Sequence, residues 1–247
     1  MRPGAIVQAR SGSTRLPAKV LADLGGRPLL WHVVSRLRAA RSLSFIGVAT
    51  TADPSDDALA AFCEAEGIPC VRGAVDDVLG RLVQAAETWG LDPVVRISGD
   101  CPFVDARVVD DLVAAHRRAD ADYTTYATPV VHEGIDPFSL RWLRRTHRRR
   151  LPADEREHPL LALRRRPHEA RIVTIPPDPA AAPRPGLRLS VDEPADLAFA
   201  RAVYAALARP DAGDGFGTSE LLALVDARPD LVALNAHVPR AVPKGIA

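Results

Sequence analysis

Strand-like and helix-like segments alternate through the first half of this chain, and that alternation limits the possible folds more than any other feature. Short runs rich in β-branched residues are typical of buried strands, and between them apolar residues recur at helical spacing. This rhythm predicts an α/β fold with a mostly parallel central sheet and helices on both faces. The expected strands are 4–9, 44–50, 68–71 and 93–97, and the expected helices are 28–40, 53–67, 75–89 and 106–118.

The second half of the chain has a weaker pattern. Residues 176–185 form a proline-rich connection, which is the only linker-like stretch. We therefore expect a single domain over 1–247, with an insertion at about 125–185. The expected elements are a loop or short strand at 130–139, an arginine-rich helix at 140–150, a strand at 187–191, and helices at 195–207 and 219–227.

The composition excludes several classes of protein. Of 247 residues, 47% are hydrophobic and 26% are charged, and the formal net charge of +1 does not favour nucleic acid or a membrane surface as a partner. No apolar run approaches the roughly 20 residues of a membrane span, and the N-terminus lacks the apolar region of a signal peptide. Three cysteines without a C-x-x-C pair fit a reducing compartment and argue against a zinc site. We expect a cytoplasmic protein.

The loop at residues 10–19, directly after the first expected strand, is the most informative stretch. It contains two arginines, a lysine, three hydroxyl side chains and a glycine. Glycine lets backbone N–H groups turn toward an anion, and the cations neutralise it, which suits a triphosphate. Lys19 stands out because Lys244 is the only other lysine of the chain. The alternative is a solvated basic loop, and the pattern of a Walker P-loop is absent.

Two aspartates follow expected strands in the same way. Asp100 lies in the turn Ser98-Gly99-Asp100-Cys101-Pro102, and Asp192 precedes Glu193-Pro194. The carboxyl ends of parallel strands share one edge of a sheet, where ligands bind. Carboxylates there can hold Mg²⁺ against phosphates. The alternative is that Asp100 is a turn residue and Asp192 a helix cap.

Other charged patterns are less specific. Asp120 and Asp122 match the D-x-D pattern of glycosyltransferases, although such short acidic patterns arise often by chance. The arginine runs at 144–150 and 164–166 are typical of solvated helix faces, and no aromatic side chains are interleaved with them as in a nucleic-acid groove.

With these residues in view, the sequence resembles the SpsF-like cytidylyltransferases of spore-coat polysaccharide biosynthesis. Their relatives make CMP-activated acylneuraminate and 3-deoxy-octulosonate. The segments that carry the resemblance are 6–21, 48–51, 72–79, 96–102, 187–197 and 234–237.

The resemblance implies a nucleotide-diphospho-sugar transferase fold, which is GT-A-like and Rossmann-like, and a homodimer. It also implies CTP as the nucleotide, Mg²⁺ on Asp100 and Asp192, and phosphate contacts from Arg10, Arg15 and Lys19. Lys19, Arg10 and Asp100 would be the catalytic residues. The residues implied to lie at the nucleotide are Ala9, Arg10, Gly12, Ser13, Thr14, Arg15, Lys19, Arg72 and Asp77.

The acceptor side departs from the family pattern at two places. Asp136 belongs to a G-I-D segment that resembles the family's G-L-D, but Pro137 and Phe138 stand where valine and glutamate are usual. Glu157 and His158 resemble an E-H-V-T segment that here lacks its threonine, with Leu160 at that place. The resemblance implies that Asp136, Glu157 and His158 contact the acceptor.

We therefore expect a Mg²⁺-dependent enzyme that transfers CMP from CTP to a sugar acid or related small anionic acceptor and releases pyrophosphate. Three alternatives stay open at this point. The enzyme could use GTP or UTP, it could be a glycosyltransferase that uses Asp120 and Asp122, or it could bind a nucleotide without catalysis.

Overall fold

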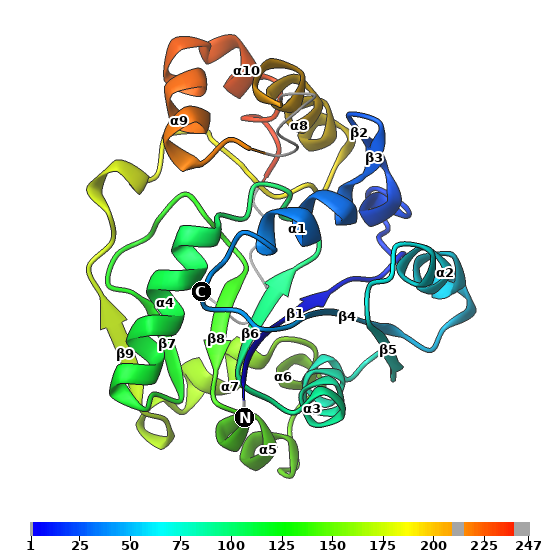
Figure 1. Ribbon diagram of the computed structural model, residues 1–247, viewed down its shortest axis with the longest axis vertical. Coiled ribbons are helices and arrows are strands. Elements are labelled where there is room, and N and C mark those ends of the chain that lie inside the picture. The colour runs from blue at the N-terminus through cyan, green and yellow to red at the C-terminus, as the bar shows by residue number, and fades with distance from the viewer. Residues whose placement is uncertain (1, 209–214, 240–247) are drawn as a thin grey trace.

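A seven-stranded sheet forms the centre of the computed structural model, which describes residues 2–208 and 215–239 (Figure 1). The strand order is β5-β4-β1-β6-β8-β7-β9, and β8 is antiparallel to both of its neighbours while the other pairs are parallel. The fold is therefore α/β with a mostly parallel sheet, as predicted. The strands are β1 (Arg2–Gln8), β4 (Ile46–Thr51), β5 (Cys70–Gly73), β6 (Leu91–Ser98), β7 (Tyr123–Tyr126), β8 (Ile135–Phe138) and β9 (Ile172–Ile175).

Helices cover both faces of this sheet, because side chains along each strand point alternately to opposite sides. In β1, Ala5 and Val7 belong to one apolar core, whereas Ile6 belongs to the other. The first core takes side chains from α1 (Leu29–Leu37), α2 (Asp57–Ala65), α4 (Ala106–Ala119), α8 (Pro194–Leu207), α9 (Thr218–Ala227) and α10 (Pro229–Ala233). The second core takes them from α3 (Val78–Trp89), α5 (Leu140–His147) and α7 (Pro159–Arg165).

The region expected as an insertion extends the sheet. Strands β7, β8 and β9 continue it beyond β6, and α5, α6 (Ala153–Glu157) and α7 lie on the face of α3. Sequence reasoning missed β7, β9 and the two short helices, because each is only four to seven residues long. A two-stranded ribbon of β2 (Asp23–Leu24) and β3 (Arg27–Pro28) was not expected either.

One expected strand is absent. Residues 187–191 are largely buried, but they form no regular element. Their backbone pairs with nearby turns, since Leu187 N–H donates to Arg184 O and Val191 N–H donates to Asp100 O. The alternating pattern was therefore a sign of burial and not of a sheet position.

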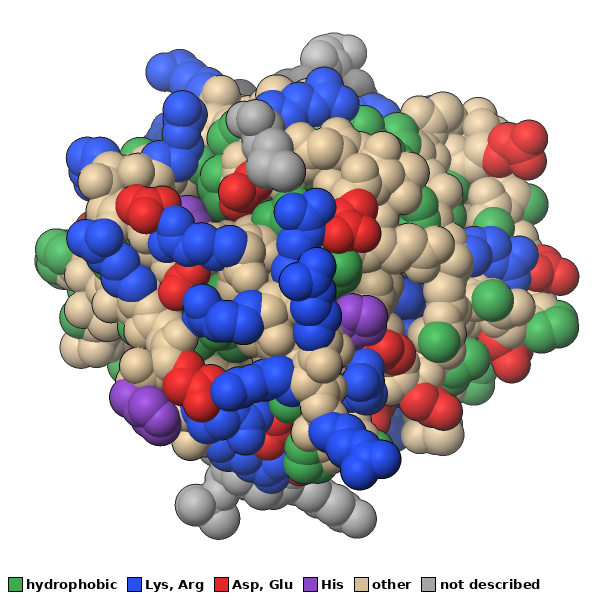
Figure 2. Space-filling model, turned by 90° about the horizontal axis from the view of Figure 1, so that it is seen from below, with side chains coloured by type: hydrophobic (Ala, Val, Ile, Leu, Met, Phe, Trp, Pro, Cys, Tyr) green, Lys and Arg blue, Asp and Glu red, His purple; other side chains and the backbone are tan. Residues whose placement is uncertain are grey.

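Arginine side chains gather over α5, α6 and α7, on the face that Figure 2 views. Many of them are neutralised by neighbouring acids: Arg144 Nε lies 2.7 Å from Glu87, and Arg165 Nη2 lies 2.7 Å from Asp154. Arg149 and Glu169 form a further pair. The runs thus form a solvated face with internal ion pairs.

Candidate active site

A buried carboxylate anchors the loop that follows β1. Asp56 lies in the short 3₁₀ turn Pro54–Asp56 after β4 and is 1% exposed. One carboxylate oxygen accepts the Ser11 N–H at 2.6 Å, and the other accepts the N–H and hydroxyl of Thr51. Burial alone would raise the pKa of Asp56, but the hydrogen bonds from Thr51 and Ser11 lower it. The sequence analysis missed this residue because its partner lies in a different loop.

The loop is folded on itself beyond that anchor. Ser11 O accepts the N–H groups of Ser13 and Ala18, at 2.8 and 3.0 Å, and Ser13 Oγ accepts the Leu16 N–H. Ala18 adopts a left-handed conformation, with a φ of 52°, directly before Lys19. Gly12, Thr14 and Arg15 are exposed, so they are open to a ligand.

Lys19 brings the two strand-end aspartates together. Its Nζ lies 2.6 Å from Asp100 Oδ2 and 2.8 Å from Asp192 Oδ1, and Arg15 Nη2 lies 3.0 Å from Asp192 Oδ1. Burial alone would lower the pKa of Lys19, but the charge of Asp100 and the hydrogen bonds to both carboxylates raise it. Burial would likewise raise the pKa of Asp100, but Lys19 and the Ser98 hydroxyl lower it.

Asp100 is positioned by the turn after β6. Ser98 Oγ donates to Asp100 Oδ1 at 2.7 Å, and Gly99 N–H donates to Gln8 O at 2.9 Å. A Cβ at Gly99 would lie 2.8 Å from Gln8 O and 2.9 Å from the Cβ of Ala9, so only glycine lets this turn approach β1. Ala9 is buried and forms the floor of the turn.

Asp192 is positioned by a buried polar network at the start of α8. The carboxylate of Asp196 accepts the N–H groups of Asp192 and Glu193, both at 3.0 Å, and pairs with Arg188. Asn235, which is fully buried near the end of the described chain, donates to Asp196 Oδ1 at 2.9 Å. Asp196 and Asn235 were not selected from the sequence for this purpose, although both lie in segments that carry the resemblance.

The carboxylate pair offers hard oxygen ligands of the kind that Mg²⁺ prefers. Asp100 Oδ2 and Asp192 Oδ1 both face the Lys19 ammonium, so they converge on one point. Within the described residues there is no cluster of three or more His, Cys, Asp or Glu side chains suited to a metal. Two carboxylates fit an ion that takes its other ligands from water and substrate phosphates.

The other residues that the resemblance places at the nucleotide have partners within the protein in this structure. Arg10 faces Glu157, with Nη2 at 3.4 Å from Oε1, and both side chains are about half exposed. Arg72 donates to the carbonyls of Thr51 and Asp53. Asp77 is the N-cap of α3 and pairs with Arg156. Arg72 and Asp77 thus make structural contacts near β5, and their contact with a nucleotide stays a prediction.

A polar cavity of about 440 Å³ lies over the ends of β7 and β8, on the side where the acceptor was expected. Asp136 lies in its wall, but the carboxylate is buried and accepts hydrogen bonds from Arg96 and from the Tyr123 hydroxyl.

Leu160 also lines the cavity, whereas Glu157 and His158 do not. Arg96, which sequence analysis missed, connects this wall to Gln8 of β1.

Phe138, which stands in the segment expected on the acceptor side, does not line the cavity over β7 and β8. Its side chain is fully buried and stacks on Trp142, with ring centroids 5.1 Å apart. The alternation of β8 turns Asp136 and Phe138 to the same face, but Phe138 pairs with Val94 deep inside the sheet. Glutamate at this position would bury an unpaired charge.

The D-x-D pattern has a structural explanation in this fold. Asp122 is buried and accepts hydrogen bonds from Ser139, from the Arg141 side chain and from the Arg171 N–H. Asp120 is the C-cap of α4 and pairs with Arg141. These carboxylates join α4, α5 and the start of β9.

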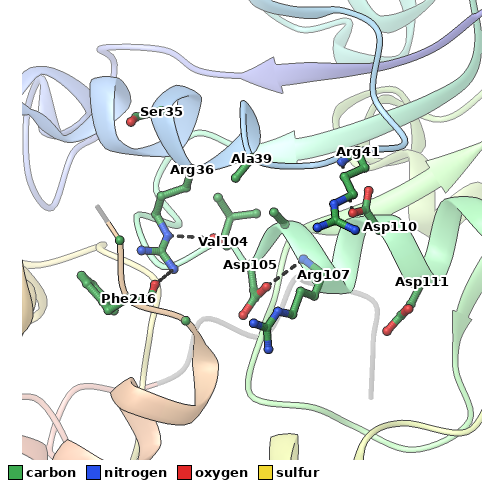
Figure 3. A pocket seen from close by; sticks show the side chains of 13 residues that line it. Ser35, Arg36, Ala39, Arg41, Val104, Asp105, Arg107, Asp110, Asp111 and Phe216 are labelled. Carbon is green, nitrogen blue, oxygen red and sulfur yellow. Dashed lines mark hydrogen bonds between the residues drawn. The ribbon is translucent and has the colours of Figure 1, made fainter. Parts of the chain in front are cut away.

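A further cavity, of about 680 Å³, lies elsewhere, between the end of α1 and the start of α4 (Figure 3). Its buried polar groups already have partners. Arg36 donates to the carbonyls of Val104 and Phe216, and Asp105 caps α4 through the Arg107 N–H. Arginines and aspartates line this cavity too. We place the candidate active site at the carboxyl edge of the sheet, because Lys19, Asp100 and Asp192 meet there beside the loop that follows β1.

An α/β sheet with a cationic loop and two converging carboxylates at its carboxyl edge defines an enzyme of the nucleotidyltransferase class. The sequence profile of the cytidylyltransferase family matches residues 4–215, and the chain belongs to that family. It is 33% identical over 232 residues to the spore coat polysaccharide biosynthesis protein SpsF of Bacillus subtilis, which covers 91% of this chain and 94% of that protein. It is 36% identical over 139 residues to a 3-deoxy-manno-octulosonate cytidylyltransferase of Anaeromyxobacter, covering 55% of this chain and 54% of that enzyme.

Solved structures share the fold. A cytidylyltransferase from Leptospira borgpetersenii superimposes with a TM-score of 0.84 at 24% identity, covering 94% of this chain and 97% of that one. A CMP:2-keto-3-deoxy-manno-octonic acid synthetase complexed with CTP gives a TM-score of 0.66 at 23% identity, covering 83% and 99%. No helix in the described ranges is long and apolar enough to cross a membrane.

Proposed function

We propose that this nucleotidyltransferase transfers CMP from CTP to a small anionic, hydroxyl-bearing acceptor and releases pyrophosphate. The observation that carries the proposal is the convergence of Lys19, Asp100 and Asp192 beside the loop at residues 10–19. Family membership supports cytidine as the base, and the resemblance to SpsF supports a product destined for a polysaccharide. We expect the protein to act in the cytoplasm, where nucleoside triphosphates are available.

The chain's own residues would bind and orient the triphosphate. Arg10, Arg15 and Lys19 would supply the cationic side chains, and the exposed residues Gly12 and Thr14 would supply backbone N–H donors. The oxygen of an acceptor hydroxyl would form a bond to the α-phosphorus in line with the departing bridge oxygen. The bond from that phosphorus to the bridge would break, pyrophosphate would leave with the electron pair, and the hydroxyl proton would pass to water. Catalysis then rests on positioning and on neutralising charge, as in phosphoryl transfer generally.

Mg²⁺ fits the carboxylate pair, and we propose that Asp100 and Asp192 hold it. When bound, the ion would stabilise negative charge on the phosphates and help orient the α-phosphate. The turn at Gly99 and the Asp196 network fix the direction of the two carboxylates before any ligand arrives.

The cavity over β7 and β8 is the best place for the acceptor. Arg96 and Arg164 line it together with the hydroxyls of Thr125 and Tyr126. Arginine guanidinium groups suit a carboxylate or phosphate on the acceptor, and hydroxyl side chains suit its alcohol groups. In this arrangement Asp136 orients Arg96, and it need not touch the acceptor itself.

A pyrophosphate-release screen tests the proposal. The four nucleoside triphosphates are incubated with Mg²⁺ and a panel of sugar acids, sugar phosphates and phosphonates. We expect release with CTP and at least one sugar acid, and none with Asp100→Asn as the control. Equal or faster release with GTP, ATP or UTP would refute the choice of nucleotide. CTP binding without turnover on any acceptor would favour a catalytically silent nucleotide-binding protein.

The homodimer implied by the resemblance needs a surface, and the β9 edge offers one. β9 ends the sheet, and Ile172 on it is one of few large apolar side chains that are exposed in the described ranges. Leu160, Leu163 and Pro167 line a shallow apolar hollow beside it. Light scattering on the full chain, with Ile172→Asp as the variant, should show a dimer that the substitution weakens.

A further inference from the structure

We propose that Lys19 occupies the position of the divalent cation in the nucleotide-free protein, so that the metal enters only after a triphosphate has drawn Lys19 away. The inference rests on the proposed function, and it adds an order of binding to it. It concerns the ammonium group, the two carboxylates and the neighbouring arginine.

The geometry places one cation where another would bind. The ammonium of Lys19 touches one oxygen of each aspartate, at 2.6 and 2.8 Å, and the Lys19 residue is 9% exposed. Mg²⁺ on the same two oxygens would bind at about 2.1 Å and keep several waters. An ion at that point and the ammonium between the same oxygens would overlap, so the two cations exclude each other.

Asp192 is neutralised further by arginines. Arg15 lies 3.0 Å from Asp192 Oδ1, and Arg188 lies 3.5 Å from Oδ2. Without these cations, Asp100 and Asp192 would be two like charges facing one another in a half-buried site. The protein therefore carries its own substitute for the metal while the site is free of ligands.

A triphosphate changes this balance. Lys19 and Arg15 belong to the loop that would receive the phosphates, so the phosphate oxygens compete with the aspartates for both cations. Arg188 belongs to the buried network and stays with Asp196. Once Lys19 turns to a phosphate, the two carboxylates and the phosphate oxygens together form a site for the metal. Nucleotide binding would thus precede tight metal binding.

Metal affinity of the nucleotide-free protein tests the idea directly. Mn²⁺ is titrated into the full chain without nucleotide, and free Mn²⁺ is followed by electron paramagnetic resonance. We expect weak binding by the natural protein and at least about tenfold tighter binding by Lys19→Met, which has a similar length and no charge, equivalent to about 1.4 kcal/mol. Adding Asp100→Asn to Lys19→Met should abolish the gain.

Arg10→Met is the matched control, because it removes one positive charge from the same loop while Arg10 faces Glu157 and not the aspartates. It should leave Mn²⁺ affinity unchanged. Equal affinity of Lys19→Met and the natural protein would overturn the proposal, and so would an equal gain in Arg10→Met. Both outcomes are independent of turnover, so they are distinct from a failure of the pyrophosphate screen.

A second measurement needs no change at Lys19. The chain has only two lysines, so ¹⁵N labelling of the lysine side chains gives two Nζ signals. The variant Lys244→Arg removes one of them and thereby assigns the other to Lys19. Lys244 itself lies outside the described residues. We expect the chemical shift of the Lys19 Nζ signal to stay unchanged with MgCl₂ alone and to change when CTP is added. A shift of the Lys19 signal with MgCl₂ alone, at the MgCl₂ concentrations used in the experiment with CTP, would overturn the proposed order.

Discussion

Asp100 and Asp192 come from distant parts of the chain, yet one ammonium group contacts both. We predict that Asp100→Asn and Asp192→Asn each lower kcat about a thousandfold, or roughly 4 kcal/mol, because asparagine keeps the shape and loses the charge. The double variant should lose little more than either single one, since one ion would serve both residues. Steady-state kinetics at saturating Mg²⁺ measures this, with thermal unfolding as the check of folding. Near-full activity in either variant would show that the substituted aspartate is not needed for catalysis and is only a turn or cap residue.

Asp56 is the second residue with a sharp expectation. We predict that Asp56→Asn raises the KM for CTP about tenfold, or roughly 1.4 kcal/mol, while the KM for the acceptor stays the same. The reason is that the amide of asparagine cannot accept from Ser11 and Thr51 on both of its ends, so the loop at 10–19 loses an anchor.

The neighbouring Asp57 provides the control for Asp56. Its side chain is 67% exposed and pairs with Arg72, outside the anchor of the loop. Asp57→Asn should leave the KM for CTP within about twofold, because exposed ion pairs contribute little. If Asp57→Asn raises this KM as much as Asp56→Asn does, the effect belongs to general charge and not to the anchor.

At the scale of elements, the hydrogen bonds between the start of α8 and the segment after α10 give the next prediction. Asn235 donates to Asp196, at the start of α8, and to the carbonyl of Arg188. We predict that Asn235→Ala lowers the free energy of unfolding by about 1–3 kcal/mol, because both buried acceptors lose a donor. It should also lower kcat, since Asp192 follows the position of Asp196.

Urea unfolding and kinetics check the prediction for Asn235. His237→Ala, two residues along and exposed, is the control and should change stability by less than about 0.5 kcal/mol. If Asn235→Ala is destabilised with kcat unchanged, these hydrogen bonds support the fold without positioning Asp192.

At the scale of the whole molecule, the buried His116 and the partly buried His132 contribute to the response to acid. Burial lowers the pKa of both His116 and His132 to about 4, and each contacts a threonine hydroxyl. The unfolded chain, with an ordinary pKa near 6.5, binds more protons between that pH and pH 4. The contribution of these histidines to stability is therefore complete above about pH 6.5 and falls as the pH is lowered, by up to about 1.4 kcal/mol per pH unit for each histidine.

Urea unfolding at several pH values between 7 and 5 checks the acid response. In this range the carboxylates are still ionised, so the histidines dominate the slope. The variants His116→Asn and His132→Gln keep a nitrogen donor for the threonine and cannot take up a proton. The double variant should show a flatter dependence of stability on pH. An unchanged slope would show that other groups titrate.

Apart from the short ribbon of β2 and β3, the sequence by itself determined the order of strands and helices in the first half, because burial periodicity is a local property of the chain. It also selected the loop at 10–19, and with it Lys19, since glycine, hydroxyl and cationic side chains cluster there. Asp100 and Asp192 were selected as a pair from their positions after two expected segments. The structure brings them together, although residues 187–191 form no strand.

Only the tertiary structure decided which polar groups meet. In the sequence Asp56 is one aspartate beside a proline, and only the fold places the Ser11 N–H against its carboxylate. Asp122 matches a metal-ligand pattern in the sequence, but in the structure its carboxylate accepts hydrogen bonds from Ser139 and Arg141. Phe138 stands where the family pattern has glutamate, in the segment expected on the acceptor side, but tertiary packing places its side chain in the core. The physical reason is that a hydrogen bond or an ion pair depends on contacts between distant segments, which local periodicity does not contain.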